Sequence, residues 1–376
     1  MKIAQVAPLW ESVPPKLYGG TERIVSYITE ELVRQGHDVT LFASGDSQTT
    51  ARLRPACSDA LRLHSGGPIN RDAPLVLMQE QALGAEAEQF DIIHSHLDCL
   101  SFPLSRRCAR PVLTTLHGRL DLPELVPVFE EYADMPVVSI SDAQRRPLPN
   151  ANWQGTVYHG LPDIYSFHPA GGSYLAYLGR ICPEKRPDHA IEIAKRVGMP
   201  LRIAAKVDPV DREYFERQIA PLMEHPLVEY VGEITDAEKC DFLGEAAAVL
   251  CTYDWPEPFG LVLIEALACG TPVLAYRRGS IPEIIEDGVT GFICENIDEM
   301  VSAIDRLPQI QRQRCRDSFE ARFTVQRMAE DYVALYERMT ALAARPKMFA
   351  NGRPSRLGSR RRMPATGLVV PQAGTA

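Results

Sequence analysis

The sequence lacks several features that would mark a membrane-bound or secreted protein. Its 376 residues contain no run of 18 uncharged apolar side chains, which argues against a membrane-spanning helix. The apolar run that follows Met1 and Lys2 is short and is broken at Glu11, so we expect no secretory signal peptide. The nine cysteines include no CxxC pair and no histidine-rich spacing, which favours reduced thiols in a cytoplasmic protein over disulfides or a zinc site.

An excess of basic residues is also missing. The formal net charge of −9 argues against a nucleic-acid-binding protein. No G-x-G-x-x-G follows the first apolar run, which argues against a dinucleotide oxidoreductase.

The charge is unevenly spread along the chain, because seven basic residues and no acid lie between Arg345 and the last residue. That segment shows little apolar periodicity, so we expect a disordered basic tail at 345–376.

The sequence does contain short apolar runs that alternate with amphipathic stretches, and this pattern occurs twice. In the first half it predicts a helix at 21–36 and strands at 2–9, 38–44, 91–96, 112–118 and 136–141. Residues 159–174 are rich in proline, glycine and polar side chains, which indicates a linker. The pattern then restarts, with helices at 187–197, at 211–223 and from Asp236, and with strands at 174–180, 200–207, 228–234, 248–254, 272–276 and 291–295.

Strands that alternate with helices predict parallel sheets covered by helices on both faces. The length of the chain suits two such domains. We therefore expect an α/β protein with two facing, doubly wound, Rossmann-like domains at 1–165 and 166–318 and a cleft between them. A helical stretch from about 315 to 343 predicts a closing C-terminal helix at 319–344. Ligands of open parallel sheets bind beyond the carboxyl ends of the strands.

The segment EPFGLVLIEALACGTPVLAY, residues 257–276, places an acid in an apolar run. Between Phe259 and Tyr276 the only charged residue is Glu265, and an unpaired carboxylate in a core costs on the order of several kcal/mol. The segment predicts a helix that starts at Phe259 and Gly260, whose N-terminus is a ready site for phosphate. Glu265 could then accept the two hydroxyls of a ribose, and Glu257 could hold a polyhydroxylated group beyond the phosphates. The alternative is a surface Glu257 and a Glu265 that bonds to a neighbouring basic side chain.

The E-x₇-E spacing of Glu257 and Glu265 resembles the signature of family 4 retaining glycosyltransferases of the GT-B architecture. Other segments resemble the same family in the same order along the chain: KLYGGTE with Gly19 and Gly20, TLHG with His117, GRICPEKRP at 179–187, YVGEI at 230–234 and GSIPEIIEDGVTGF at 279–292. The resemblance implies transfer of a sugar from a nucleotide-diphosphate sugar to a glycan, lipid or small-molecule acceptor. It places the acceptor on the side of the N-terminal domain and the donor on the side of the C-terminal domain.

The resemblance also implies a role for particular residues. Glu265 should hold the donor ribose, and Glu257 with the backbone amides of Phe259, Gly260 and Leu261 should contact the donor sugar and distal phosphate. Arg180 and Lys185 should neutralise the diphosphate, and we expect their substitution to affect folding little, because a cleft-facing charge contributes little to stability. The remaining predicted contacts are His117 to the donor sugar, Gly19 and Gly20 to phosphate or acceptor, and Gly232 to Ile234 near the base.

No D-x-D triplet occurs in the chain, and that spacing is the one that would chelate a divalent metal between a diphosphate and the protein. With Arg180 and Lys185 present, its absence favours metal-independent transfer, and we expect neither a metal nor another cofactor. The sequence departs from the family pattern at His159, where many relatives have asparagine, and at Lys206, where glycine is frequent.

Other functions stay open at this point. A degenerate module that only binds sugar nucleotides, or an epimerase or phosphorylase of the same architecture, would share the predicted fold. The basic run RRCAR at 106–110 and the tail at 345–376 leave open a peripheral contact with the inner face of a membrane.

Overall fold

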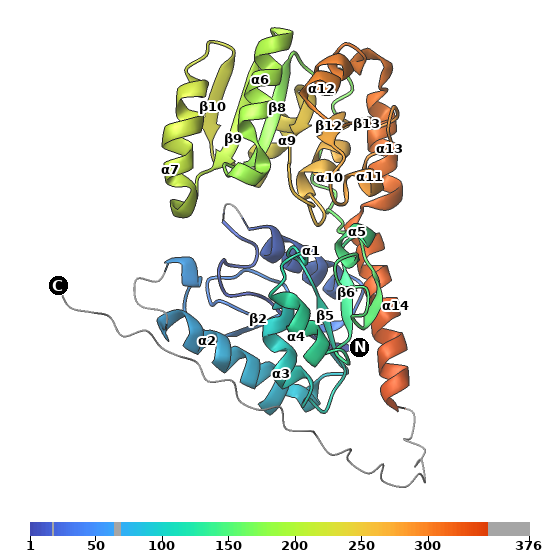
Figure 1. The fold of residues 1–376 in the computed structure, drawn as a ribbon. Helices are drawn as coiled ribbons and strands as arrows, with labels where there is room; N and C mark the ends of the chain where they lie inside the picture. The colour runs from blue at the N-terminus through green and yellow to red at the C-terminus, as the bar shows by residue number, and fades with distance from the viewer. Residues whose placement is uncertain (17–18, 64–68, 345–376) are drawn as a thin grey trace, which may run out of the picture.

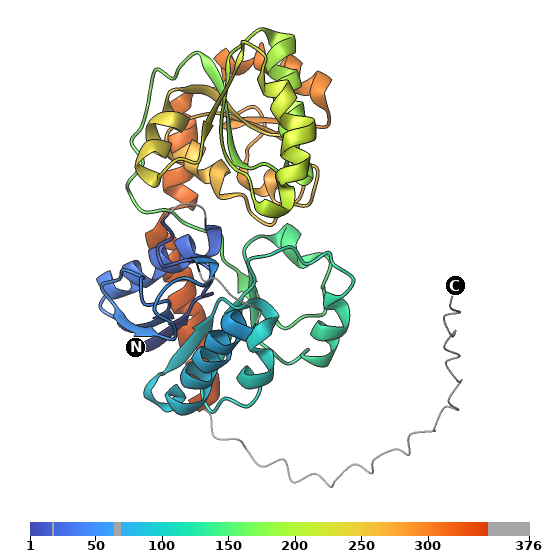
Figure 2. The same ribbon diagram turned by 90° about the vertical axis from the view of Figure 1, so that its left-hand side faces the viewer.

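The computed structural model describes residues 1–16, 19–63 and 69–344, and it contains two α/β domains that face each other (Figures 1 and 2). The predicted tail at 345–376 lies outside the described residues. Among the helices that the structure describes, none is long and apolar enough to cross a lipid bilayer.

The N-terminal domain is built on a sheet of seven parallel strands in the order β3-β2-β1-β4-β5-β6-β7. Its strands are β1 (Lys2–Val6), β2 (Asp38–Ala43), β3 (Arg52–Pro55), β4 (Ile92–Ser95), β5 (Val112–Thr115), β6 (Val137–Ser139) and β7 (Trp153–Thr156). Its α-helices are α1 (Gly20–Arg34), α2 (Ile69–Glu80), α3 (Phe102–Ser105), α4 (Leu125–Glu131) and α5 (Asp142–Arg145). Shorter 3₁₀ and π turns lie at Leu61–Leu63, Gln81–Ala85, Ala87–Gln89 and Asp98–Ser101.

The C-terminal domain is built on a sheet of six parallel strands in the order β10-β9-β8-β11-β12-β13. Its strands are β8 (Tyr174–Arg180), β9 (Leu201–Lys206), β10 (Val228–Gly232), β11 (Ala246–Cys251), β12 (Val273–Tyr276) and β13 (Gly291–Cys294). Its α-helices are α6 (Pro187–Val197), α7 (Arg212–Tyr214), α8 (Ala220–Met223), α9 (Asp236–Gly244), α10 (Leu261–Ala268), α11 (Ile281–Ile284), α12 (Ile297–Ile304) and α13 (Arg312–Arg322). Shorter 3₁₀ and π turns lie at Pro183–Lys185, Pro209–Asp211, Phe215–Ile219 and Leu307–Gln309.

The predicted α/β architecture is therefore confirmed, down to the helix at 187–197. Successive side chains of a strand lie on opposite faces of the sheet, so that Ile3 joins a cluster with α1 while Ala4 joins a cluster with α2. Because both neighbours in the sequence are apolar, both faces of the sheet are apolar. In each sheet the strand order reverses once, between β1 and β4 and between β8 and β11. Open α/β sheets bind ligands at such switch points.

The helical stretch expected at 315–343 is two helices rather than one. Helix α13 ends at Arg322, and α14 (Val325–Ala344) begins after a break at Phe323 and Thr324. Thr324 forms a β-bridge with Leu161, whose amide donates to the Phe323 carbonyl at 2.9 Å. The break exists because the chain crosses between the domains here, beside its first crossing in the linker.

Helix α14 packs on the N-terminal domain, although it ends the described chain (Figure 1). Its buried side chains join α1 and the apolar face of the sheet in one cluster, to which it contributes Met328, Ala329, Tyr332, Leu335, Tyr336 and Met339. Helix α14, the last helix that the structure describes, therefore completes the core of the first domain.

Candidate active site

A cavity of about 510 Å³ lies between the two domains, at the carboxyl ends of both sheets. Eleven of the twelve residues predicted from the sequence line it, and the twelfth, Gly232, does not. The eleven are Gly19, Gly20, His117, Arg180, Lys185, Ile234, Glu257, Phe259, Gly260, Leu261 and Glu265. His159 and Lys206, the two departures from the family pattern, line it as well. The structure thus brings the predicted set together, while the roles of its members stay predictions.

The N-terminus of α10 opens into this cavity. Gly260 caps the helix with φ +85°, a left-handed conformation that side chains other than glycine rarely adopt. The segment before it is held from behind, because Ser280 donates its hydroxyl to the Phe259 carbonyl at 2.8 Å and its amide to the Glu257 carbonyl at 3.0 Å. The first amides of a helix have no intrahelical acceptor, so this end can bind an anion.

Glu257 is buried, so the alternative that places it on the surface is wrong. Its Oε2 accepts hydrogen bonds from Lys185 Nζ at 2.9 Å and from Trp255 Nε1 at 3.0 Å. The Lys185 ammonium also lies 4.0 Å from the centre of the Tyr253 ring. The two side chains are only 14% and 10% exposed, so the ion pair is largely shielded from water.

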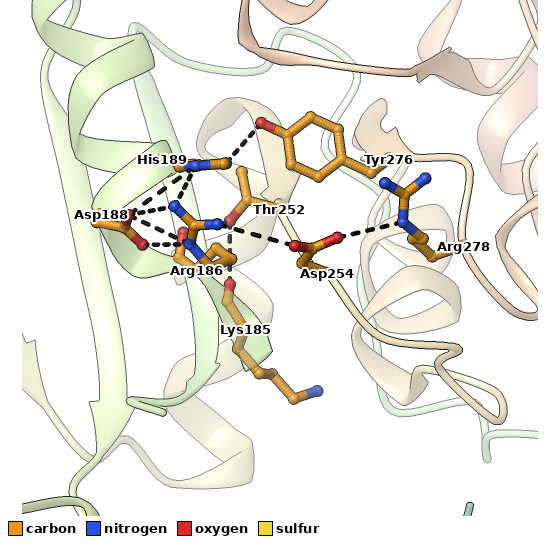
Figure 3. A network of polar contacts seen from close by, with 8 residues as sticks. All are labelled: Lys185, Arg186, Asp188, His189, Thr252, Asp254, Tyr276 and Arg278. Atoms are coloured by element: carbon orange, nitrogen blue, oxygen red, sulfur yellow. Dashed lines mark hydrogen bonds and ion pairs between the residues drawn. The ribbon is translucent and has the colours of Figure 1, made fainter. Parts of the chain in front are cut away.

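A polar network behind Lys185 fixes its backbone (Figure 3). Thr252 Oγ1 lies 3.1 Å from the Lys185 carbonyl and 2.8 Å from the Arg186 carbonyl. Arg186 has φ +47°, and its guanidinium pairs with Asp188 and with Asp254. The network holds this turn from one side, and the Lys185 ammonium extends away from it (Figure 3).

Arg180 ends β8 and lies among acids. Its guanidinium is 3.5 Å from Asp208 and 3.6 Å from Asp211, and Lys206 pairs with the same Asp208 at 2.6 Å. Arg180 and Lys185 therefore line the cavity with their charges already balanced by carboxylates. A bound anion would have to compete with those carboxylates for the two cations.

Glu265 is 2% exposed and has basic partners, as expected from the alternative hypothesis that it bonds to a neighbouring basic side chain. Its Oε1 accepts hydrogen bonds from Lys239 Nζ at 2.9 Å and from Tyr165 Oη at 3.1 Å. Burial on its own would raise the pKa of Glu265, but the charges of Lys239 and Arg23 and these hydrogen bonds bring the pKa below its ordinary value. The carboxylate is ionised and lines the cavity, so a basic partner and a ligand-binding position coexist.

Arg23 extends this ion network across the domain boundary. It belongs to α1 of the N-terminal domain and forms an ion pair with Asp236 at the start of α9. Asp236 in turn pairs with Lys239 at 3.1 Å. Sequence reasoning missed Arg23 and Lys239. The one available signal was the run YVGEITDAEK, in which a helix start brings a lysine next to the predicted base-binding segment.

Glu22 is a further cavity residue that the sequence did not single out. It lies in the first turn of α1 and is 6% exposed. Burial, opposed by backbone hydrogen bonds and reinforced by the charge of Glu11, raises its pKa to about 7. The wall formed by the N-terminal domain thus carries an acid that titrates near neutral pH.

His117 follows β5 and faces the cavity in a group of buried histidines. Its ring stacks on that of His159, with 5.4 Å between centroids, and its Nε2 lies 2.9 Å from His96 Nδ1. Burial lowers the pKa of His117 to about 3 and lowers the pKa values of His94, His96 and His159 well below their ordinary value. The four imidazoles are therefore neutral at physiological pH.

Replacing His159 with asparagine is expected to make the fold less sensitive to acid. A histidine with a lowered folded pKa contributes stability that is complete above the unfolded pKa of about 6.5 and is lost as the pH falls toward the folded value. Each such histidine steepens the loss by about 1.4 kcal/mol per pH unit. Denaturant unfolding between pH 6.5 and 5 should show a slope that is smaller by this amount in His159→Asn, whereas Ser95→Ala should keep the wild-type slope. Equal slopes for His159→Asn and the wild type would contradict the burial of a neutral His159.

The basic run at 106–110 is partly neutralised. Arg106 pairs with Glu131 at 2.9 Å and with Asp134 at 2.6 Å, and its guanidinium lies over the Tyr132 ring. Arg110 donates to the Glu88 carbonyl at 2.9 Å. These contacts leave less free positive charge for an anionic membrane than the sequence indicates, and the membrane contact stays a prediction.

Comparison with known proteins decides the family. Residues 166–321 match the profile of the glycosyl transferases group 1, and residues 18–156 match that of glycosyltransferase family 4. N-acetyl-alpha-D-glucosaminyl L-malate synthase of Bacillus anthracis is 35% identical over 360 residues, which cover 85% of this chain and 93% of that protein. The chain belongs to the group 1 glycosyltransferases. These matches confirm the resemblance to family 4 glycosyltransferases that the motifs of this glycosyltransferase indicated.

Solved structures share the fold of this glycosyltransferase. Sucrose-phosphate synthase from Thermosynechococcus elongatus superposes with a TM-score of 0.75 at 19% identity, covering 91% of this chain and 99% of that one. Anabaena HepE in complex with UDP and glucose superposes with a TM-score of 0.69 at 20% identity, covering 90% of this chain and 100% of that one. At these identities the likeness establishes the two-domain GT-B architecture.

Proposed function

We propose that this glycosyltransferase moves a sugar from a nucleotide-diphosphate sugar to an acceptor with retention of configuration and without a metal ion. The observation that carries the proposal is the meeting of Lys185, Arg180 and the N-terminus of α10 in one cavity. Two cations and free helix amides together form a site for a diphosphate.

The leaving nucleoside diphosphate gains negative charge as the glycosidic bond breaks, and groups already in place for that charge lower the barrier. Lys185 and Arg180 would supply it from the C-terminal domain. Glu257 lies 2.9 Å from the Lys185 ammonium, so it would hold that ammonium and accept hydroxyls of the donor sugar. Glu265 would accept the ribose hydroxyls, with Lys239 keeping its charge in place.

The reaction would proceed on one face of the sugar. The bond between the anomeric carbon and the phosphate oxygen breaks, and the acceptor oxygen forms its bond to that carbon on the same face. The acceptor proton passes to the departing phosphate oxygen. A neutral His117 would accept a hydrogen bond from the sugar without adding positive charge beside the developing oxocarbenium ion.

A uridine diphosphate sugar is the first donor to test. HepE shares the fold and was determined with UDP and glucose. The Bacillus anthracis relative is named for transfer of N-acetylglucosamine to L-malate, a small acceptor. For this chain the acceptor class stays as broad as glycan, lipid or small molecule. Because a ligand that binds the native state raises the melting temperature, a thermal-shift panel of UDP-, GDP- and ADP-sugars would identify the base.

Activity is expected to survive chelation. If Lys185 and Arg180 balance the leaving charge, initial rates of transfer or donor hydrolysis should be unchanged in excess EDTA and should not rise with graded Mg²⁺ or Mn²⁺. The anomeric signal of the product, followed by NMR, should match that of the donor. Complete loss of activity under EDTA that metal restores would show that a cation carries the charge, and donor binding without turnover would favour a binding module.

A further inference from the structure

A chain of buried polar groups runs from α14 to the cavity. Tyr332 Oη lies 2.9 Å from Thr115 Oγ1, and Thr115 Oγ1 lies 2.7 Å from His94 Nε2. His94 Nδ1 lies 2.7 Å from Tyr336 Oη, which in turn lies 3.3 Å from Gln5 Nε2. These groups come from α14, β5, β4 and β1, so four elements meet in one hydrogen-bonded line.

The line continues from Gln5 to the predicted active-site histidine. Gln5 Oε1 lies 2.8 Å from His96 Nε2, and His96 Nδ1 lies 2.9 Å from His117 Nε2. Gln5 is fully buried in β1, an inner strand of the sheet, in register with His94 on β4. A buried amide in such a position is kept for the hydrogen bonds it makes.

The orientation of the Gln5 amide gives the line a direction. A carbonyl oxygen can only accept, so His96 Nε2 must carry the hydrogen that reaches Gln5 Oε1. In a neutral ring the other nitrogen has a lone pair, so His96 Nδ1 accepts and His117 Nε2 donates. At the other end the Gln5 amide nitrogen donates to Tyr336 Oη, which leaves that hydroxyl to donate to His94 Nδ1.

The three imidazoles are neutral because burial lowers the pKa values of His94, His96 and His117. His117 Nδ1 is the ring nitrogen left over, and it has no hydrogen-bond partner among the described residues. The ring lines the cavity, so its lone pair is available to a ligand there.

We propose that Gln5 is a positioning residue: through His96 it holds His117 as the Nε2–H tautomer, so that His117 Nδ1 accepts a hydrogen bond from a hydroxyl of the donor sugar. The contact with the sugar rests on the proposed function, whereas the tautomer does not. An acceptor nitrogen leaves the hydroxyl oxygen richer in electrons, which favours a positive charge developing on the sugar ring. The opposite tautomer would present a donor and withdraw electron density.

The tautomer can be measured in the full chain without any ligand. Histidine labelled with ¹⁵N distinguishes protonated from unprotonated ring nitrogens, and a His117→Asn spectrum assigns the signals of His117. We expect hydrogen on Nε2 and none on Nδ1 in the wild type. Hydrogen on Nδ1 of His117 would overturn the proposal, even for a fully active enzyme. Failure of the proposed function would appear separately, as an unexpected substrate or no turnover with the expected tautomer present.

Two variants of Gln5 test its role. Gln5→Met has a similar size but no acceptor, so the rings of His96 and His117 should exchange between tautomers and kcat should fall roughly three- to tenfold, the range for one lost hydrogen bond, with the donor KM changed less. Gln5→Glu keeps an oxygen that accepts from His96 Nε2, so the wild-type tautomer of His117 should persist at every pH at which the ¹⁵N spectrum shows a neutral His96. Ser95→Ala is the control, because Ser95 lies on β4 beside His94 but hydrogen-bonds to Ser101 at 2.9 Å, outside the line. An unchanged His117 tautomer in Gln5→Met, or hydrogen on His117 Nδ1 beside a neutral His96 in Gln5→Glu, would overturn the proposal.

Discussion

Replacing Lys185 with methionine is expected to lower kcat/KM by about two orders of magnitude or more, the cost typical of losing one preorganised group that stabilises transition-state charge. The structure adds a second consequence that the sequence did not indicate. Lys185 and Glu257 form a shielded pair at 2.9 Å, so removing the cation leaves a buried carboxylate without its charge partner. Breaking such a pair costs about 3–5 kcal/mol. For Lys185 we therefore expect a measurable loss of stability, in place of the small effect on folding expected from the sequence.

A double variant separates the two effects. In Lys185→Met with Glu257→Gln both charges are gone, so the free energy of unfolding should recover most of the loss seen in the single variant, while the activity should stay low. Denaturant titration and initial rates on the same preparations measure both quantities. Arg180→Met is a useful companion, because Arg180 is a third exposed and should lose activity with a smaller loss of stability. A Lys185→Met enzyme with wild-type rates would contradict its role at the diphosphate.

Replacing Glu265 with glutamine is expected to weaken donor binding by about ten- to a hundredfold, because hydrogen bonds from hydroxyls to a charged acceptor are worth ~1.5–3 kcal/mol. Glu31→Gln is the matched control. Glu31 is also a buried glutamate with a lowered pKa, held by Arg34, but it lies on α1 outside the cavity. Titration of each variant with the donor should show the loss for Glu265 alone. Equal donor affinities in the two variants would remove Glu265 from the donor site.

Glu265 should also affect how the free energy of unfolding depends on pH. The folded pKa of Glu265 lies below the ordinary glutamate value of 4.5, so the carboxylate contributes stability that is complete above that value and is lost as the pH falls through the folded pKa. The stability difference between wild type and Glu265→Gln should therefore be constant from pH 7 to 5 and should shrink below about pH 4.5. Chemical denaturation at a series of pH values measures it. A difference that grows on acidification would contradict an ionised Glu265.

The sequence predicted those parts of the fold that depend on local pattern. The helix at 187–197 has a proline at its first position and a glycine after its last, and both ends were predicted correctly. The predicted cavity residues lie at strand ends and at one helix start, positions that parallel topology brings together. The ion pairs of the site, in contrast, depend on contacts between segments that are far apart in the sequence.

The features that escaped prediction depend on residues far apart in the sequence. Glu265 forms an ion pair with Lys239, and the charge of Arg23 from the other domain lowers its pKa. Neither contact could be predicted, since no periodicity in the sequence connects α1, α9 and α10. The break between α13 and α14 likewise follows from the bridge between Thr324 and Leu161 rather than from a local helix-breaking residue. Gly232 has φ +79° and lies one position before the cavity-lining Glu233, so the sequence located the segment and missed the residue.

Helix α14 also imposes an order on synthesis. The strands of the sheet face that it covers are complete once about 160 residues have been made, but residues 325–344 follow only after the whole C-terminal domain. At about 5–20 residues per second, the nascent N-terminal domain spends on the order of ten seconds or more with the part of that apolar face beside α1 uncovered. The C-terminal sheet is covered by helices adjacent to it in sequence and has no such delay. The half of the enzyme that is translated first is thus the half whose core is completed last, after the other domain has been made.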